Sequence, residues 1–370
     1  MPSSGAGSRT EPPTLHPVER LVAIEARGTR FTEALRAAWD VGDAVLPVDP
    51  RLPRAAAAAL VESLQVGAPV ERGVALVVPT SGTTGVPKGV QLTHEQIGAS
   101  AEATSSFLGV DPARHRWLAC LPLAHVGGLS VVTRAWHTGT PLEVHDGFDA
   151  AAVDAAARAG CTHVSLVATA LARIDASAWA RIVLGGAAPP PDRPSNTVAT
   201  YGMTETGSGV VYDGVALPGV ELRIDDGEIL VRGPMVAARY RDGTPVVDDA
   251  GWLHTGDLGR LDDGILTVHG RRGDMIITGG ENVHPDPVEQ RLRQHPAVAD
   301  AAVVGRPDPE WGQRVVAVLE LSPGADAPDL DEVRGWVREA LPPWSAPKEL
   351  EVVDALPRTA LGKVRRAAVR

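Results

Sequence analysis

The sequence predicts an α/β protein with two domains. Short apolar runs alternate with helical patterns between residues 74 and 200, which favours a mostly parallel, doubly wound sheet. Short runs separated by turn residues follow over about 208–269 and predict a small antiparallel β region. From residue 271 the order is strand, helix, strand, strand, helix, strand, which is typical of a compact α+β unit. We therefore expect a large N-terminal domain over 21–270 and a small C-terminal domain over 271–370, after a disordered lead over 1–20.

The composition is that of a globular protein with an acidic balance. The 370 residues suffice for two domains, and the formal net charge of −11 argues against broad binding to nucleic acid or to an anionic membrane. Cys120 and Cys161 stand far apart in apolar surroundings, so we expect both to be reduced core residues. The polar first residues contain no apolar signal core, and no stretch is long and apolar enough to span a bilayer. We therefore expect a cytoplasmic protein.

The N-terminal domain begins with two helical patterns on either side of a short strand. Apolar spacing predicts helices over 31–39 and 55–64, with a strand inside 42–50 that ends in proline turns. The valine-rich run 74–78 predicts a buried strand, and a helical pattern follows over 92–107. The remaining elements expected in the parallel sheet are strands over 117–121, 163–167, 181–184 and 197–200, and a helix over 150–159.

Turn residues and alternation organise the rest of the chain. Asp226 and Gly227 separate two alternating runs, 220–224 and 228–231, and predict a hairpin turn. The C-terminal unit is predicted from six runs with strand or helix periodicity, namely 275–277, 287–294, 301–304, 315–320, 330–340 and 350–353.

The loop TSGTTGVPKG at residues 80–89 follows the strand at 74–78 and is suited to binding phosphate. Glycines let the backbone approach an anion, while hydroxyls, amide N–H groups and a lysine supply donors and positive charge. The residues expected to do so are Thr80, Ser81, Gly82, Thr83, Thr84, Gly85 and Lys88. The loop lacks the Gly-Lys-Ser/Thr triplet of a Walker A motif. A flexible linker has a similar composition, but a linker rarely follows a buried strand and leads into a helix.

Six motifs in the same order resemble those of the adenylate-forming superfamily, which contains acyl-CoA synthetases, peptide-synthetase adenylation domains and luciferases. The loop at 80–89 resembles its phosphate loop. The other matches are a histidine motif at 121–128, an adenine and metal motif at 201–206, a ribose motif at 255–258, a hinge with the following strands at 270–274 and 279–283, and a terminal lysine motif at 357–363. The resemblance covers about residues 42–370, and it implies that the C-terminal domain is mobile.

Within that superfamily the sequence is most similar to the o-succinylbenzoate–CoA ligases of menaquinone biosynthesis, in their short actinobacterial form. The stretches that carry this likeness are 42–53 (GDAVLPVDPRLP), 162–171 (THVSLVATAL) and 207–219 (GSGVVYDGVALPG). Two departures stand out. The phosphate loop already begins at residue 80, where family members usually carry a further N-terminal subdomain, and Gly273 replaces the Asp or Lys of many relatives at the hinge, which should loosen the pivot.

The resemblance implies a reaction in two halves. A substrate carboxylate attacks the α-phosphate of ATP and expels pyrophosphate, and the thiol of coenzyme A then attacks the acyl-adenylate. Two anions meet in the first half, so the site needs cations and hydrogen-bond donors more than a general base. The resemblance assigns Lys363 to bridge the carboxylate and the α-phosphate, Thr204 to contact that phosphate, and Glu205 to hold Mg²⁺.

The remaining roles follow from the same resemblance. The backbone at Gly185, Gly186 and Ala187 and the segment Tyr201, Gly202 and Met203 are expected around adenine, with Asp257 on the ribose and Arg271 on ribose or phosphate. His125 is expected to line the acid pocket and to take part in catalysis. The donors for the second carboxylate and the ketone of the acid are expected among Ser165, Thr169, Ser208 and Arg134, and Gly279 and Gly280 should leave room for the pantetheine arm.

Several alternatives stay open at the level of sequence. Taken alone, Tyr201 could be a core aromatic, Asp257 a turn residue and Lys363 a solvated lysine. The acid could instead be an aryl or medium-chain fatty acid, and a non-catalytic adenylate-binding regulator or a P-loop phosphotransferase are further options. The expected partners are small molecules, namely the carboxylic acid, ATP and coenzyme A, and a homodimer is an open possibility, with no nucleic acid and no membrane span.

Overall fold

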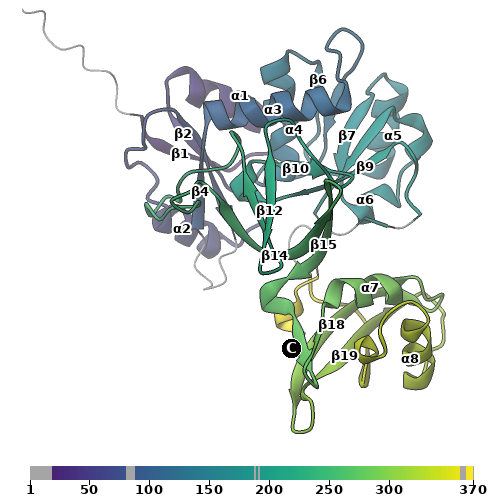
Figure 1. Cartoon of the computed structure of the whole chain (residues 1–370). Coiled ribbons are helices and arrows are strands. Elements are labelled where there is room, and N and C mark those ends of the chain that lie inside the picture. The colour runs from purple at the N-terminus through teal and green to yellow at the C-terminus, as the bar shows by residue number, and fades with distance from the viewer. Residues whose placement is uncertain (1–18, 81–87, 187–188, 191, 359–363, 370) are drawn as a thin grey trace, which may run out of the picture.

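The computed structural model describes residues 19–80, 88–186, 189–190, 192–358 and 364–369. Figure 1 shows a large part that contains the first two thirds of the chain and a smaller part below it, which contains α7, α8, β18 and β19. Several expected features lie outside the described residues. They are almost all of the expected disordered lead, Ser81 to Gly85 of the phosphate loop, Ala187 and Lys363.

Eight α-helices lie in the described part of the chain. They are α1 (Gly28–Asp40), α2 (Arg54–Ser63), α3 (His94–Leu108), α4 (Val126–Thr138), α5 (Ala150–Arg158), α6 (Ala168–Leu171), α7 (Pro285–Arg293) and α8 (Leu330–Arg338). Short 3₁₀ helices occur at Ala176–Ala178, Thr204–Thr206, Arg272–Asp274, Pro343–Ser345 and Arg366–Ala368.

The first sheet has four strands in the order β1 (Leu21–Ile24), β2 (Ala44–Pro47), β3 (Val74–Thr80) and β4 (Lys88–Thr93). β3 and β4 are antiparallel, and Thr80 pairs with Lys88, so the phosphate loop closes an antiparallel strand pair. The prediction that the helix begins at Leu92 was therefore wrong. Leu92 lies in β4, and α3 begins after Thr93, whose side chain forms a capping box with Gln96.

The second sheet has eleven strands and joins the predicted parallel and antiparallel regions. Its order is β12 (Glu221–Asp225), β13 (Glu228–Arg232), β14 (Leu253–Asp262), β15 (Ile265–Arg271), β11 (Val215–Ala216), β10 (Gly209–Tyr212), β9 (Thr197–Gly202), β8 (Arg181–Leu184), β7 (His163–Leu166), β5 (Trp117–Ala119) and β6 (Leu142–Val144). The strands from β9 to β6 are parallel, and those from β12 to β10 are antiparallel. The fold class predicted from the sequence is confirmed, except that β3 belongs to the separate four-stranded sheet.

β9 connects the two halves of the large sheet. Its first half, Thr197 to Ala199, pairs in parallel with β8, whereas Thr200 to Gly202 pairs antiparallel with β10. The end of β9 therefore leaves the parallel sheet at its carboxyl edge, where α/β proteins place ligands.

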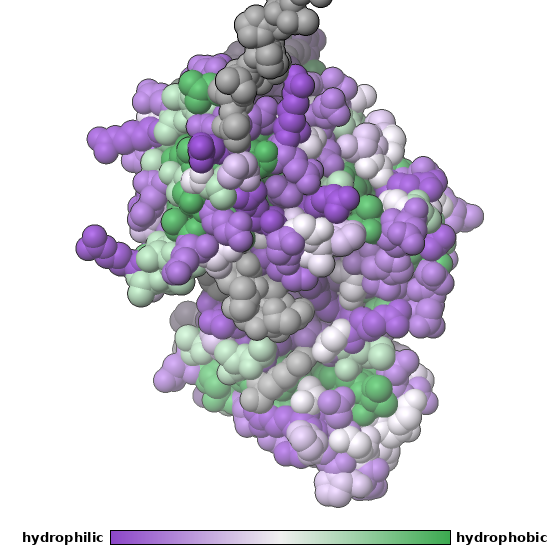
Figure 2. Space-filling model, turned by 90° about the vertical axis from the view of Figure 1, so that its left-hand side faces the viewer, coloured by the Kyte–Doolittle hydropathy of each residue, from purple (hydrophilic) through white to green (hydrophobic). Residues whose placement is uncertain are grey.

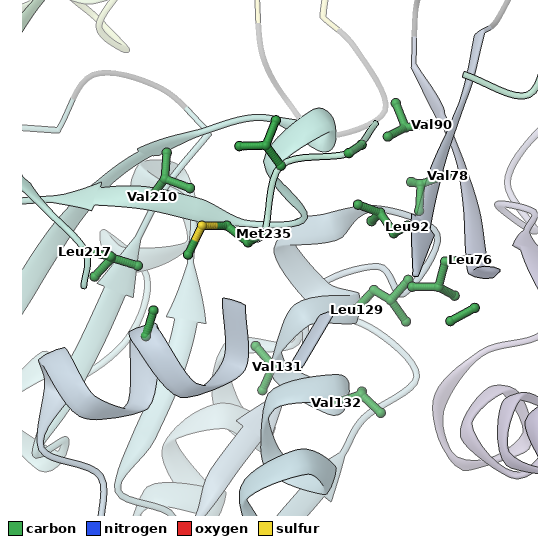
Figure 3. Close-up of a cluster of buried hydrophobic side chains, with 14 of the residues drawn as sticks. Leu76, Val78, Val90, Leu92, Leu129, Val131, Val132, Val210, Leu217 and Met235 are labelled. Atoms are coloured by element: carbon green, nitrogen blue, oxygen red, sulfur yellow. The ribbon is translucent and has the colours of Figure 1, made fainter. Parts of the chain in front are cut away.

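One hydrophobic core joins both sheets of the large part. Leu76 of β3 and Leu92 of β4 lie close to Leu129 of α4, while Val210 and Met235 lie on the opposite side of the same cluster (Figure 3). Each such side chain stabilises the fold by about 2 kcal/mol when fully buried. The phosphate-loop strands and the large sheet are thus held together through α4.

The C-terminal part has its own sheet and its own core. The strand order is β17 (Glu281–Val283), β16 (Ile276–Thr278), β19 (Gly312–Leu321) and β18 (Val298–Asp308), and β20 (Glu349–Val353) pairs in parallel with β19. α7 and α8 contribute apolar residues to a separate buried cluster. The predicted order is confirmed with β17 added to it. The exact domain boundary at 270–273 stays a prediction.

The predicted hairpin turn and the two core cysteines are confirmed. Asp226 and Gly227 both have positive φ angles and form the turn between β12 and β13. Cys120 and Cys161 are buried and unpaired with each other, and burial raises the pKa of the Cys120 thiol to about 12.

Among the described residues, no helix combines the length and the apolar character that a bilayer crossing requires. On the face shown in Figure 2, hydrophobic side chains occur in small groups among hydrophilic ones.

Gly128 is required where α4 starts beneath the loop that follows β5. A Cβ atom there would lie 2.6 Å from the carbonyl oxygens of both Leu121 and Pro122, whereas a Cβ at Gly335 of α8 would meet no atom within 4 Å. We expect Gly128→Ala to destabilise the protein by about 2 kcal/mol or more and Gly335→Ala to stabilise it by about 0.5–1 kcal/mol. Urea unfolding of both variants measures this, and equal effects would contradict the packing described.

Candidate active site

Three side chains predicted for the nucleotide come together at the end of β9. The Tyr201 hydroxyl donates to Asp257 Oδ2 at 2.9 Å, and Arg271 Nε donates to Asp257 Oδ1 at 2.9 Å. Asp257 in β14 and Arg271 in β15 are direct cross-strand partners, so the sheet register itself brings the two charges together. Burial, followed by the charge of Asp257, raises the pKa of Tyr201, which therefore stays a neutral donor. This cluster orients the carboxylate that the sequence assigns to the ribose.

A second tyrosine orients the predicted metal ligand. Glu205 lies in the 3₁₀ helix Thr204–Thr206, and its Oε1 atom accepts a hydrogen bond of 3.0 Å from the Tyr240 hydroxyl. Lys88 of the phosphate loop lies above the same tyrosine, with Nζ 4.8 Å from the ring centroid. The structure thus brings Lys88 and Glu205 to one aromatic side chain. Sequence reasoning missed Tyr240, although it is one of only three tyrosines in the chain.

Glycines keep the turns around this site narrow. A Cβ at Gly202 would lie 2.2 Å from the carbonyl oxygen of Ser208, so the segment that contains Met203 and Thr204 must turn sharply against the next strand. Gly186 has a φ angle of +87°, which favours glycine, and a Cβ at Gly185 would meet Thr200 Oγ1 at 2.9 Å. The backbone after β8 therefore approaches the end of β9 closely, as the adenine prediction requires.

The residues fit a magnesium ion that reaches the site together with ATP. Among the described residues there is no group of three or more His, Cys, Asp or Glu side chains that could hold a metal. Glu205 offers one carboxylate, and Mg²⁺ usually binds through one or two carboxylates together with substrate phosphates and water. The donor set therefore suits a nucleotide-borne Mg²⁺ better than a resident metal.

His125 lies at the N-terminus of α4 and faces an ion pair between the buried Asp49 and the exposed Arg51. Its Nε2 atom is 3.4 Å from Asp49 Oδ2, while Arg51 binds Asp49 through Nε and Nη2. The hydrogen bonds from Arg51 lower the pKa of Asp49 to about 2. Burial lowers the pKa of His125, and the charge of Asp49 opposes that effect. Sequence reasoning missed Asp49 and Arg51 as site residues, although both lie in the stretch 42–53 that carried the family likeness.

Arg134 and Ser208 lie beside the same small cavity. The cavity is lined by side chains of β3, β4, α3 and α4 and by the backbone at Gly207, including Leu76, Leu92, Ser100, Leu129 and Arg134. Ser208 Oγ is 2.9 Å from Ser100 Oγ, so it stands directly behind that wall. Arg134 is only 2% exposed, and its Nε and Nη1 atoms have no hydrogen-bond partner among the described residues. Such a buried cation is costly unless an anion meets it.

The other two candidates for acid binding lie elsewhere. Thr169 lines a larger cavity of about 420 Å³ that opens at the carboxyl ends of β2, β5, β6 and β7, together with Asp49 and Arg51. Ser165 is buried within β7. The structure therefore groups Arg134 with Ser208, and it does not bring Thr169 or Ser165 to the wall of their cavity.

The aromatic rings of Trp117 and His163 pack next to each other beside Arg134. The guanidinium carbon is 4.9 Å from the centroid of Trp117 in β5, and His163 of β7 is the direct cross-strand partner of Trp117, with ring centroids 5.0 Å apart. Burial, with smaller contributions from His115, Arg181 and Arg134, lowers the pKa of His163 to about 4. His163 is therefore neutral at pH 7.

The glycines of the predicted pantetheine path form the turn between β16 and β17. Gly279 and Gly280 have φ angles of +60° and +84°, and a Cβ at Gly279 would lie 2.6 Å from the ring of Trp311. Lys348 Nζ lies 3.5 Å from the Trp311 ring centroid, and Trp311 is 39% exposed.

A Cβ at the predicted hinge residue Gly273 would meet no atom within 4 Å beyond its chain neighbours. The space around Gly273 therefore does not demand glycine.

Comparisons with known proteins agree with this geometry. Sequence models of two families match the chain: AMP-binding enzyme over residues 65–241 and AMP-binding enzyme C-terminal domain over residues 287–363. A probable 2-succinylbenzoate–CoA ligase of Mycobacterium tuberculosis is 42% identical over 84% of this chain and 87% of its own length.

Solved structures are similar to almost the whole chain. The o-succinylbenzoate CoA synthetase of Bacillus subtilis in complex with its acyl-adenylate intermediate superposes with a TM-score of 0.86 at 30% identity, over 96% of this chain and 89% of the other. The same Bacillus subtilis enzyme in complex with ATP and magnesium ion gives a TM-score of 0.84 at 29% identity, over 95% and 90%.

The depressed pKa of His163 predicts an acid-sensitive fold. As the pH falls below about 6.5, His163 takes up a proton in the unfolded chain, whereas in the folded protein it does so only near pH 4. The free energy of unfolding therefore decreases as the pH falls through this window. Between pH 7 and pH 4.5, we expect the free energy of unfolding to fall by about 2 kcal/mol more in the wild-type protein than in His163→Gln. Urea unfolding at both pH values measures the difference, and parallel losses in the two proteins would contradict it.

Proposed function

Because this chain belongs to the family of AMP-binding enzymes, we propose that it is an ATP-dependent acid–CoA ligase that converts o-succinylbenzoate into o-succinylbenzoyl-CoA, a step of menaquinone biosynthesis. The relative in Mycobacterium tuberculosis bears this substrate in its name, and the Bacillus subtilis structure contains the corresponding acyl-adenylate. The observation within this chain that carries the choice of acid is the buried Arg134, which has two unbonded nitrogen atoms beside a cavity.

The first half-reaction joins two anions, so the site must supply positive charge and donors. We assign Asp257, held by Tyr201 and Arg271, to the ribose hydroxyls. Lys88 and the phosphate loop are assigned to the leaving pyrophosphate, and Glu205, held by Tyr240, to the magnesium ion that accompanies ATP. When bound, the ion neutralises phosphate charge. Each carboxylate is oriented by a tyrosine hydroxyl, which fixes it before the nucleotide arrives.

The acid must satisfy Arg134. o-Succinylbenzoate has two carboxylates, so one can attack ATP while the other pairs with the guanidinium in a bidentate arrangement. An arginine keeps its charge even where burial lowers its pKa, as at Arg134. Benzoate or a fatty acid would leave this cation buried without a partner, which disfavours the two alternative acids. Ser100, which lines the cavity and is bonded to Ser208 behind it, is the hydroxyl assigned to the polar groups between the two carboxylates.

Two further expectations from the sequence stay predictions. A cytoplasmic location is supported by the acidic composition, and a homodimer has no support beyond the sequence. We also retain His125 beside Asp49 as a residue of the acid side, and Gly279 and Gly280 as the passage for coenzyme A.

A panel of acids tests the proposal. We expect acid-dependent pyrophosphate release and AMP formation with o-succinylbenzoate, and much slower release with benzoate, octanoate, and the two analogues that each lack one carboxylate, 4-oxo-4-phenylbutanoate and 2-butanoylbenzoate. Faster turnover of benzoate or octanoate would reject the proposed substrate. No release with any acid would favour a non-catalytic adenylate-binding protein, and formation of ADP instead of AMP would favour a phosphotransferase.

Substitution of Arg134 extends the same assay. Arg134→Met should lower kcat/KM for o-succinylbenzoate roughly 100-fold, because it removes one partner of a buried charge pair, and should affect an acid without the second carboxylate far less. The matched control is Arg36→Met. Arg36 also stacks on a tryptophan, 4.2 Å from the Trp136 centroid, but it is exposed. Equal losses for both kinds of acid would argue against this role of Arg134.

The terminal lysine is tested by separating the half-reactions. We propose that the predicted mobile domain, residues 271–370, brings Lys363 to the carboxylate and the α-phosphate only during adenylation. Lys363→Ala should then abolish formation of the acyl-adenylate but leave thioester formation from supplied adenylate within about threefold, since the lysine acts as a point charge in one step only. Arg338→Ala serves as the control for an exposed cation of the same domain. Equal loss of both half-reactions would reject alternation of the domain.

A further inference from the structure

We infer that Trp117 is a positioning residue that selects for dicarboxylic acids, because its indole face holds the guanidinium of Arg134 in place before substrate binds. This inference rests on the proposed function and adds to it a residue that does not itself touch the acid. The relevant observation is the order of three side chains from three elements: His163 of β7, Trp117 of β5 and Arg134 of α4.

Strand pairing and ring packing hold the indole of Trp117 in place. Trp117 is fully buried, and its strand is paired with β6 on one side and β7 on the other. His163 packs at 5.0 Å with its ring tilted by 59°, and His115 packs behind His163 at 4.6 Å. The guanidinium of Arg134 lies over the indole ring, 4.9 Å from its centroid. The cation therefore rests on a side chain that the sheet holds in place.

This arrangement leaves the hydrogen-bonding capacity of Arg134 unused. Other arginines in the described part of the chain bind carboxylates directly, such as Arg306 with Glu351 and Arg293 with Asp300. By contrast, the Nε and Nη1 atoms of Arg134 have no hydrogen-bond partner among the described residues. An aromatic face attracts a cation through its quadrupole but does not occupy N–H donors arranged in the guanidinium plane. The donors thus stay available for an incoming carboxylate.

The second neighbour of the indole supports the same role. His163 Nδ1 lies 2.9 Å from Thr162 Oγ1, and the imidazole is neutral at pH 7. A protonated His163 would place a second buried cation next to Trp117, and it would repel the guanidinium of Arg134. With a neutral imidazole, this repulsion is absent. The flexible arginine side chain loses less entropy on binding the acid, because it is already ordered.

The test compares Trp117→Leu, which removes the aromatic face, with Trp117→Phe, which keeps a smaller one. We expect Trp117→Leu to raise KM for o-succinylbenzoate about tenfold with kcat within about twofold, and Trp117→Phe to stay within about threefold of the wild-type KM. For 4-oxo-4-phenylbutanoate and 2-butanoylbenzoate, neither variant should change KM by more than about twofold. Trp136→Leu is the matched control, because Trp136 lies on α4 and stacks on the exposed Arg36.

A double-mutant cycle separates positioning from a merely structural effect. If Trp117 acts through Arg134, then Trp117→Phe and Trp117→Leu cause no further rise in KM in the Arg134→Met background. Thermal unfolding and AMP affinity establish that each variant is folded, and Trp117→Phe carries the test if Trp117→Leu does not fold. Additive effects, or equal losses for acids with one and two carboxylates, would overturn the inference while the proposed function stands. Absence of wild-type turnover of o-succinylbenzoate would reject both.

Discussion

The constraint on which this structure depends is the presence of a buried cation that the fold leaves without a carboxylate. Arg134 is withdrawn from water by α4 and by the core that joins both sheets, and its neighbour is an aromatic face. Burial of such a cation is costly until an anion pairs with it. In the proposed function, this unpaired cation is the basis of selectivity for an acid with two carboxylates.

The nucleotide side differs, since its two carboxylates already have partners among the described residues. Asp257 is held by Tyr201 and Arg271, and Glu205 is held by Tyr240. Both carboxylates retain free lone pairs, so they can accept further bonds without moving. The change of pairing along β9 contributes to this arrangement, because its first half pairs with the parallel strand β8 and its second half, which contains Tyr201, pairs with the antiparallel strand β10.

The sequence predicted the fold class and most strands, because these depend on local periodicity and on patterns that are contiguous in the chain. The roles of the nucleotide-site side chains stay predictions. The sequence did not predict that β3 belongs to a separate sheet, since pairing with β2 and β4 is a long-range property that apolar content does not reveal. Tyr240, Asp49 and Trp117 were missed for a related reason. Each acts on a residue far away in sequence, and an isolated tyrosine, aspartate or buried tryptophan has no local signature.

The two cavities explain why the four acid candidates were separated. Thr169 follows a parallel strand, and the carboxyl edge where such strands end is the usual place for a ligand. Arg134 instead projects from the middle of a helix, a position that normally serves packing. We propose that it serves binding here because α4 contributes to the core that joins both sheets, while His125 at the start of the same helix lies 3.4 Å from Asp49. In this proposal one helix presents a histidine to Asp49 and an arginine to the acid, and the close approach at Gly128 fixes where the helix begins.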